Sequence, residues 1–477
     1  MNLASNLRIL KKGDLDRIHE ATVKILEETG IKFVSLEVRE IFKKHGAKVE
    51  GEIVYISRKM LDDALKTAPS SFKWWGVDES NSIIMGEGQK RTHISPNNGP
   101  IYIQDLDNGK RLGTMEDLIN LYKLCQAFDV VDIIGAIPVD PSDIDNNGKH
   151  LQVMYQLLKH TNKPLIGFTG TKEEINQMFD MVEIVIGKKD YLLDHPTIGV
   201  SVNPLSPLKF DDRGCTTILE YARKGQPIFI LTCALAGVSG PISLMGTAVL
   251  QNAEILAGMV LTQLINPGTP FVYSPASTVA NMKKASYITG TPEANIINIA
   301  CMQLAHEVYN LPSRSMAGLT DSKVVDCQAG YETMQNVFGL MTSGTQLINE
   351  CLGVIDSIMT TSYEKFILDV EMMSRVLRFM EGMDTSEKSL SIDVIKEVGH
   401  EGSYITHPST FKKFRSLWTP LVSDWNSYNE WEEKGKEDVV IAANRKYKEI
   451  LKKCPESVID LQTDKDLKNY IKRVCFR

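Results

Sequence analysis

The sequence of 477 residues lacks several features that would assign it directly to a class of protein. It has no block or stripe of basic residues, since 53 Lys and Arg are scattered against 60 Asp and Glu, with a formal charge of -7. A nucleic-acid surface is therefore not expected. The eight cysteines include no CxxC pair and have no zinc-ligand spacing. We interpret them as reduced thiols of a cytoplasmic protein without a bound metal.

Long apolar runs and common catalytic motifs are also missing. The N-terminus has no apolar core followed by a small-residue cleavage site, so it predicts a helix and not a signal peptide. The most apolar stretch, residues 253–268, is too short to span a membrane and contains Glu254 and Gln263. No GxxxxGK[ST], HExxH or GxSxG motif occurs, and His93 and His195 are isolated. Membrane anchoring, a phosphate-binding loop and a metal site are thus not indicated.

What the sequence does contain is a series of short β-rich runs separated by helical stretches. The runs are IYIQD, VDIIGAI, PLIGFTG, TIGVSVNP, PIFILTC, PFVYSPA, LPSRSMAGL and QLINECLG, which begin at residues 101, 131, 164, 197, 227, 270, 311 and 346. Eight strand–helix units with mostly apolar strands predict an α/β fold, a (β/α)8 TIM barrel. The seventh run contains Pro and Arg, and the eighth also suits a helix. A doubly wound sheet is the alternative, but no GxGxxG follows the first run.

Two helical flanks surround the predicted barrel. We expect an N-terminal, mainly helical extension over residues 1–90, the catalytic barrel over 91–380 and a C-terminal helical extension over 381–477. Helical flanks beside a barrel lead us to expect a homo-oligomer.

Polar and aromatic residues gather in the loops that would follow the strands, where the working residues of such barrels lie. The segment GLTDSKVVDCQAGYE, residues 318–332, carries Asp321, Lys323, Asp326 and Gln328. An equally plain interpretation is that the aspartates cap the next helix and that Lys323 is their solvated partner. Five aromatic residues are candidates for the mouth of the barrel, although each alone is more often core: Tyr102, Phe168, Phe210, Tyr273 and Tyr287. Together they would suit a compact cation held by ring faces.

Several motifs in order resemble one known family. GPIYIQDLDNGKRLGTMEDL, VNPLSPLKFD, SYITGTPE, AGLTDSKVVDCQAGYE and SYEKFILDVEM are similar to the trimethylamine methyltransferase family, in the branch that lacks pyrrolysine. The resemblance covers essentially the whole chain. It implies a barrel that passes a methyl group from a quaternary amine to the cobalt of a separate corrinoid protein, with no cofactor bound permanently by this chain. Lys323 falls near the position that pyrrolysine occupies in the other branch.

The chemistry agrees with this division of the family. A quaternary ammonium is already activated and leaves as a neutral tertiary amine, so the protein needs neither a general base nor a covalent nucleophile. Its task is to hold the N–CH3 bond in line with the acceptor and to exclude water. Glycine betaine is the first choice of substrate, followed by proline betaine and then carnitine or γ-butyrobetaine.

The resemblance and the loop positions together suggest site residues. Lys323, Asp321 and Glu350 are the catalytic candidates, with Asp321 and Glu350 offering charge opposite to the ammonium. The substrate-binding candidates are Asn97, Asn98, Tyr102, Phe168, Tyr273, Gln328 and His400. Among these, Tyr102, Phe168 and Tyr273 would face the ammonium, and Asn97, Asn98, Lys323 or His400 would serve a carboxylate or line the cavity.

Two other functions remain open from the sequence. One is a barrel that binds quaternary amines without turnover, as a sensor does. The other is an aldolase or hydrolase in which Lys323 forms a Schiff base. Such a lysine is usually desolvated, and the neighbouring Asp321 and Asp326 argue against it.

Overall fold

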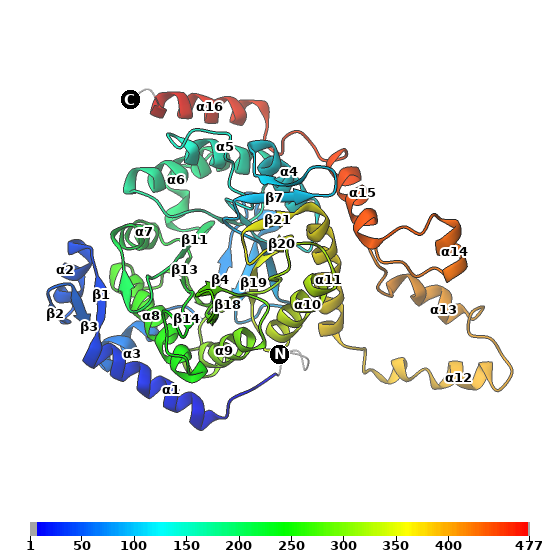
Figure 1. The fold of residues 1–477 in the computed structure, drawn as a ribbon, viewed down its shortest axis with the longest axis horizontal. Helices are drawn as coiled ribbons and strands as arrows, with labels where there is room; N and C mark the ends of the chain where they lie inside the picture. Colours follow the sequence, from blue (N-terminus) through cyan, green and yellow to red (C-terminus); the bar gives the residue numbers. More distant parts are fainter. Residues whose placement is uncertain (1–6, 476–477) are drawn as a thin grey trace.

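The computed structural model describes residues 7–475, in which strands and helices alternate around a common centre (Figure 1). The central strands are β6 (His93–Pro96), β9 (Ile134–Gly135), β10 (Leu165–Ile166), β11 (Ile198–Val202), β13 (Ile228–Thr232), β15 (Phe271–Pro275), β18 (Arg314–Met316) and β19 (Leu347–Cys351). Each is followed by one long helix: α4 (Met115–Ala127), α5 (Lys149–His160), α6 (Lys172–Ile186), α7 (Asp212–Arg223), α8 (Leu244–Ile265), α9 (Pro292–Gln303), α10 (Cys327–Thr342) and α11 (Tyr363–Glu381). The fold is of the α/β class.

All pairings among the central strands are parallel. One sheet has the order β15-β13-β11-β10-β9 and another the order β18-β19-β6. A parallel bridge between Tyr273 and Ser313 joins β15 to the start of β18. The amides of Asp132 and Ile133 donate to the Ile94 carbonyl and so link β9 to β6. Because the strands are parallel, their carboxyl ends share one end of the molecule, which we call the mouth together with the loops that follow them.

All eight predicted runs contain a strand, but only seven of these are central strands, and the first lies outside the central set. The run at residue 101 forms β7 (Tyr102–Asp105), which pairs antiparallel with β8 (Gly109–Leu112) and parallel with β21 (Thr360–Ser362). The central position belongs to β6, whose sequence HISP is too short and too polar to stand out as a strand. Its four residues are nevertheless all buried.

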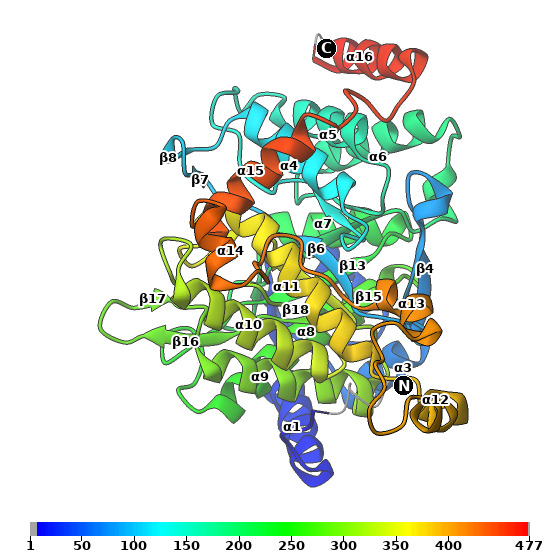
Figure 2. The same cartoon turned by 90° about the vertical axis from the view of Figure 1, so that its right-hand side faces the viewer.

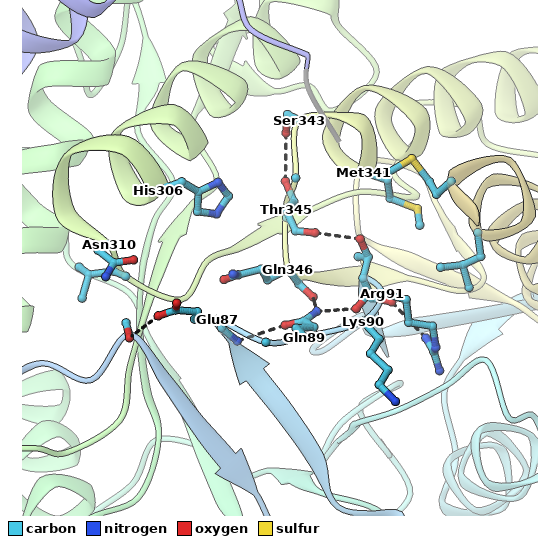
Figure 3. Close-up of a pocket in the computed structure, with 18 of the residues that line it drawn as sticks. Glu87, Gln89, Lys90, Arg91, His306, Asn310, Met341, Ser343, Thr345 and Gln346 are labelled. Carbon is cyan, nitrogen blue, oxygen red and sulfur yellow. Dashed lines mark hydrogen bonds between the residues drawn. The ribbon is translucent and has the colours of Figure 1, made fainter. Parts of the chain in front are cut away.

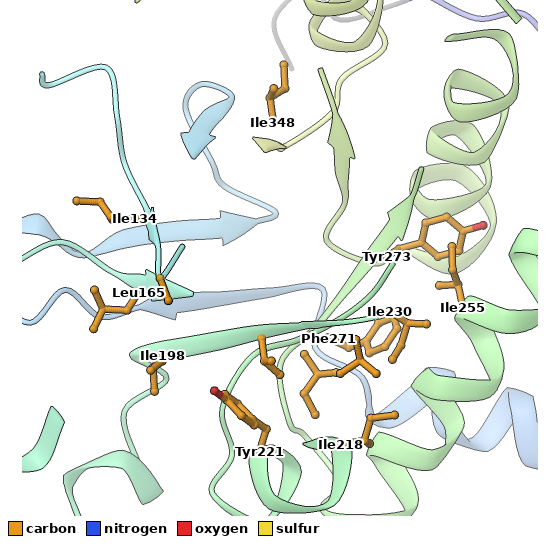
Figure 4. Close-up of a cluster of buried hydrophobic side chains, with 14 of the residues drawn as sticks. Ile134, Leu165, Ile198, Ile218, Tyr221, Ile230, Ile255, Phe271, Tyr273 and Ile348 are labelled. Atoms are coloured by element: carbon orange, nitrogen blue, oxygen red, sulfur yellow. The ribbon is translucent and has the colours of Figure 1, made fainter. Parts of the chain in front are cut away.

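The outward faces of the central strands pack on the surrounding helices (Figure 4). In this layer Tyr273 lies beside Ile255 of α8. Helix α8 is the one helix in the described part of the chain that is long and apolar enough to cross a membrane, but 78% of its apolar window is buried inside the protein. It contacts α1 (Lys12–Lys24), α3 (Arg58–Thr67), α7 and α9 and is therefore a core helix.

The amino ends of the central strands are closed by a hairpin. Strands β4 (Ser71–Trp74) and β5 (Ile83–Gly86) carry Trp74, which is fully buried and donates its indole N–H to the Thr197 carbonyl at 3.0 Å. Its ring meets Gly199, where a Cβ would lie 2.8 Å from the indole. The apolar layer around it is completed by Met85, Ile133, Ile166, Phe229, Val272 and Leu347. The space enclosed by the central strands is therefore filled by a packed core at this end.

Shorter elements complete the chain. Before β4, strands β1 (Ile31–Phe33), β2 (Lys48–Glu50) and β3 (Ile53–Tyr55) with α2 (Leu36–Lys44) form a small sheet that β12 (Lys209–Phe210) joins. The mouth carries β14 (Leu235–Ala236), β16 (Thr278–Asn281), β17 (Ser286–Tyr287) and β20 (Val354–Ile355). After α11 come α12 (Ile392–Val398), α13 (Pro408–Lys413), α14 (Tyr428–Glu433), α15 (Val439–Leu451) and α16 (Leu461–Cys475).

Candidate functional site

A cavity of about 400 Å³ opens at the mouth. It is lined by residues that lie at the carboxyl ends of six of the central strands or follow them: Asn98, Ile137, Gly167, Phe168, Thr169, Ser201, Val202, Asn203, Asp211, Arg213, Gly214, Leu231 and Glu350. The loops after different strands supply side chains of different chemistry to one space, as expected at the carboxyl ends of parallel strands.

Glu350 is the buried carboxylate of this cavity. It lies in β19 with a left-handed backbone, φ 56°, which is uncommon for a residue other than glycine. Its Oε2 accepts the backbone N–H of Asn98 at 2.9 Å, and its Oε1 lies 3.6 Å from Nη2 of Arg314. Burial raises the pKa of Glu350 to about 7, against the opposing effects of Arg314 and the Asn98 amide. The cavity therefore holds a carboxyl group that changes charge near neutral pH.

Arg314 supplies a buried positive charge beside this carboxylate. It is 1% exposed and lies in β18, where Nη2 donates to Oδ1 of Asn349. The Asn349 amide in turn donates to the Pro96 carbonyl at 2.7 Å and to Oγ of Ser95 at 3.3 Å, which fixes its orientation. Nη1 of Arg314 finds no hydrogen-bond partner among residues 7–475. A buried donor without a partner costs about 1–3 kcal/mol, and Arg314 acts on the cavity through Glu350, since it is not itself among the lining residues.

Two further groups border the pair. Burial raises the pKa of Cys233 to about 12, which keeps its side chain a neutral thiol. The Tyr287 hydroxyl donates to the Ala276 carbonyl at 3.2 Å, and burial holds its pKa well above the usual value. Neither group is poised to act as a base at neutral pH.

The outer part of the cavity is held by ordinary structural contacts. Asp211 caps α7 by accepting the Gly214 amide at 2.8 Å. The guanidinium of Arg213 donates to the Thr169 carbonyl at 2.7 Å. Phe168 also lines the cavity, with its ring 6.5 Å from the His150 ring in an edge-on arrangement. The cavity thus combines one apolar ring, one buried carboxylate and a rim of polar groups, a set that suits a small cation.

Three of the predicted site residues line this cavity: Asn98, Phe168 and Glu350. Oδ1 of Asn98 accepts the Ile137 amide at 3.1 Å, which orients the side chain. Asn97 is fully buried next to them and donates to Oγ1 of Thr361 at 2.6 Å. Its Oδ1 has no partner within the described chain.

Asp321 and Gln328 lie in a loop-holding network. The Asp321 carboxylate accepts both backbone amides of Thr289 and Gly290, at 2.9 Å each, and the hydroxyl of Ser357 at 2.6 Å. Gln328 donates to Glu332 at 2.9 Å. The oxygens of Asp321 are therefore engaged with neighbouring loops, and its position favours an anchoring role over contact with a ligand.

Three further predicted site residues lie away from the cavity. The side chain of Lys323 is 68% exposed, and its ammonium bonds to the Asp321 carbonyl at 2.5 Å. Tyr102 lies under the ammonium of Lys110, 4.4 Å from the ring centroid. His400 is exposed in the segment after α12. The structure does not bring these residues together with Glu350.

Tyr273 was predicted to face the ammonium, and the structure contradicts this prediction. Its ring packs on the outward face of β15 toward α8, and its hydroxyl donates to Oδ1 of Asn252 at 2.7 Å (Figure 4). Phe210 likewise stacks on Phe33, with centroids 5.0 Å apart, and belongs to the core. Strand alternation turns such residues outward, and this direction was not assigned from the sequence.

Arg314 and Asn349 were not predicted. The signal was nevertheless present, because the arginine in LPSRSMAGL interrupts an otherwise apolar strand. A charged residue in the middle of a buried strand points to a paired or functional charge.

A second cavity, of about 700 Å³, lies near the amino ends of the central strands (Figure 3). Its polar groups are largely engaged: Gln89 donates to the carbonyls of Arg91 and Gln346, and Arg91 pairs with Asp132 at 2.7 Å. Burial lowers the pKa of His306 to about 4, so its ring is neutral beside Oγ of Ser313. This cavity is larger than the one at the mouth, but it lacks a buried, partly free charge.

Comparisons with known proteins agree with the sequence motifs. The family model described as trimethylamine methyltransferase (MTTB) matches residues 1–475. A glycine betaine methyltransferase of Desulfitobacterium hafniense (strain Y51) is 36% identical over 470 residues, covering 98% of this chain and 97% of the relative. A proline betaine:corrinoid methyltransferase of Eubacterium limosum is 32% identical and covers 82% of each chain. A trimethylamine methyltransferase, MttB, of Methanosarcina thermophila is 29% identical and covers 97% and 96%.

Among solved structures, the monomethylamine methyltransferase MtmB of Methanosarcina barkeri superposes with a TM-score of 0.56. The match covers 95% of this chain and 89% of that one at 13% identity, which relates the two folds only. The family model spans nearly the whole sequence, and the betaine relatives align over most of their own length. The chain belongs to the trimethylamine methyltransferase family.

Proposed function

We propose that the protein transfers a methyl group from a quaternary amine, glycine betaine or a related betaine, to the Co(I) of a separate corrinoid protein and releases the tertiary amine. The observation that carries the proposal is the buried Glu350 carboxylate in the cavity at the mouth, next to a phenyl ring and the partly unpaired Arg314. Similarity to glycine betaine and proline betaine methyltransferases supports the same substrate class.

We also infer that the eight central strands close into a (β/α)8 barrel, the catalytic unit of residues 91–380, between helical extensions of 1–90 and 381–477. The parallel pairs, the bridge between Tyr273 and Ser313 and the amide contacts to Ile94 support closure. The apolar layer under Trp74 supports a filled interior at the amino end. We expect a soluble cytoplasmic enzyme, in keeping with its unpaired cysteines.

In the proposed reaction, the N–CH3 bond of the substrate breaks and its electron pair stays on nitrogen, so the leaving group is neutral. The methyl group passes to the Co(I) of the acceptor protein, which supplies the electron pair of the new bond. No proton moves, and none of the residues at the cavity needs to act as a base. The protein contributes by orientation and by exclusion of water, which account for a large part of the rate in such transfers.

The cavity offers a place for each end of a betaine. A quaternary ammonium donates no hydrogen bond, so it is best held by an aromatic face and an opposite charge, here Phe168 and ionised Glu350. The carboxylate would pair with the guanidinium of Arg213, which lines the cavity, while Arg314 lies beside Glu350 and is not part of the cavity wall. Asn98 fixes Glu350 through its backbone amide and adds a polar side chain.

The methyl acceptor is expected to dock at the mouth, because the opposite end is filled by Trp74 and its neighbours. The corrinoid then belongs to the partner and is a substrate for this chain. The name of the Eubacterium limosum relative, which includes corrinoid, supports this kind of partner.

Calorimetric titration with a panel of methylated amines tests the substrate class. We expect saturable binding of one betaine and no binding of trimethylamine, followed by demethylation of that betaine when reduced corrinoid protein is added. Binding without methyl transfer to any corrinoid protein would indicate a sensor. Silence toward the whole panel, with the acceptor protein present as well, would contradict the proposed substrate.

A further inference from the structure

A long segment after α11 projects from the body of the protein without covering anything. We call residues 382–417 the arm; it contains α12 and α13 and extends to one side of the molecule (Figure 1). None of the described residues in the arm is buried. Ordering a backbone costs about 1–2 kcal/mol per residue, and a helix as short as α12, with 7 residues, is marginal on its own. The arm therefore needs a surface that this copy of the chain does not supply.

The arm presents apolar side chains to solvent. Met383 is 83% exposed, Ile405 76%, Phe411 68% and Leu417 66%. Nine of its large apolar residues are exposed in all. At roughly 100 Å² for each side chain, they amount to on the order of 900 Å², close to the ~800 Å² that each partner buries in a stable complex. Scattered exposed apolar residues are ordinary, but this concentration on one projecting segment marks an interface.

Both ends of the arm are attached to the body of the protein, which fixes the direction in which the arm extends. At its start it continues directly from α11. Just past its end, the Glu371 carboxylate of α11 accepts the amides of Leu421 and Val422 at 2.8 and 2.7 Å. The indole of Trp418 donates to Ser374 at 3.0 Å. An arm held at both ends can insert into a partner at little additional cost in entropy.

The charge pattern of the arm is self-complementary. Residues 384–401 contain five acidic residues and two lysines, and residues 402–417 contain Lys412, Lys413 and Arg415 with no acidic residue. In a two-fold dimer each contact occurs twice in reciprocal form. The acidic α12 region of one arm can thus face the basic α13 region of the other, while the apolar residues between them are buried.

The position of the arm excludes the methyl acceptor as its first partner. Figure 2 shows α12 and α13 on the side of β4, whereas β7, β16 and β17 of the mouth lie at the opposite side. A protein that delivers its cofactor to the mouth would not cover the arm. We therefore propose that the arm is the dimer interface of this protein, where two copies of the chain pair through residues 382–417.

Light scattering during size-exclusion chromatography tests this directly. The wild-type chain of 53.3 kDa should elute with at least twice that mass. The double variant Ile405→Glu/Phe411→Glu should elute at the mass of one chain, with unchanged circular dichroism because both side chains are exposed. Leu461→Glu on α16, at a site 90% exposed, is the matched control and should keep the wild-type mass.

Charge-reversal variants test whether the arm binds a second copy of the chain. The variants Asp393→Lys/Glu397→Lys and Lys412→Glu/Lys413→Glu should each weaken self-association by tenfold or more. When the two variants are mixed, they should pair with each other, because each reversed half then meets its complement. A monomeric wild-type chain would overturn the proposal. A dimer that all these changes leave intact would overturn it as well.

Discussion

Glu350 is the residue whose charge should control substrate affinity. Burial raises its pKa to about 7, so the carboxyl is mostly neutral below that pH and mostly ionised above it. A quaternary ammonium keeps its charge at every pH. Betaine affinity should consequently rise as the pH increases through 7 and level off above it. In Glu350→Gln the affinity at pH 8 should fall about tenfold, or ~1.4 kcal/mol, and the pH dependence should vanish.

Calorimetry from pH 5.5 to 8.5 on both proteins measures this. A Glu350→Gln variant that binds betaine as the wild type does, with the same pH profile, would remove Glu350 from ammonium recognition. Circular dichroism of both proteins is the control for folding, because Arg314 loses its charged neighbour in the variant.

Lys323 offers a contrast at the same end of the molecule. Its side chain is 68% exposed and bonds to a carbonyl of its own loop. Lys323→Met should leave the dissociation constant for betaine within about twofold of the wild-type value, since exposed contacts of this kind contribute little. A loss of betaine binding in the titration would instead show that Lys323 belongs to the substrate site, as predicted from the sequence.

At the scale of elements, Asp321 links the loops that follow three central strands. Its oxygens accept the amides of Thr289 and Gly290 and the hydroxyl of Ser357. Asp321→Asn turns one acceptor into a donor that faces these N–H groups, so we expect a loss of about 1–3 kcal/mol in the free energy of unfolding. Hydrogen exchange at residues 289 and 290 should become faster.

Asp326→Asn provides the comparison, because Asp326 caps α10 through the Ala329 amide at 2.9 Å. It should cost at most about 1 kcal/mol and leave exchange at 289 and 290 unchanged. Equal exchange in both variants would mean that Asp321 does not hold the mouth loops.

The packing of the individual strands explains which of them could be predicted from the sequence and which could not. Strands β13 and β15 were found because their residues are apolar on both faces. Strand β6 was missed because its burial depends on tertiary contacts, such as the one between His93 and the Ile84 carbonyl. Polar loops after the strands were correctly placed at the mouth, but whether Tyr273 faced the interior depended on strand register, which a lone sequence does not specify.

Arg314 shows how far the candidate site could be predicted from the sequence. Its charge is compatible with a central strand only because Asn349 and Glu350 of the neighbouring β19 meet it there. That pairing follows from the order of strands in the sheet. The family resemblance and the loop positions suggested Glu350 as a charge opposite to the ammonium, and its neighbour Arg314 is evident only where β18 and β19 lie side by side.

At the scale of the whole molecule, the proposed function requires that the mouth receive a second protein. Ile242 and Met282, which follow β13 and β15, are 66% and 63% exposed. Both reach Gly237, where a Cβ would lie 3.0 and 2.9 Å from them, so they form one apolar patch beside the cavity. Because the patch lies on the loops where the acceptor is expected to dock, it should contribute to that contact.

Met282→Glu should therefore lower kcat/KM for the corrinoid protein about tenfold, by placing a charge in the apolar contact, while the dissociation constant for betaine stays unchanged. Steady-state transfer rates at varied acceptor concentration, together with calorimetry of betaine alone, separate the two effects. Leu461→Glu, on the distant α16, should change neither. If Met282→Glu altered betaine affinity instead, the patch would belong to the substrate site; if it altered nothing, the acceptor would have to approach the cavity over a different part of the mouth.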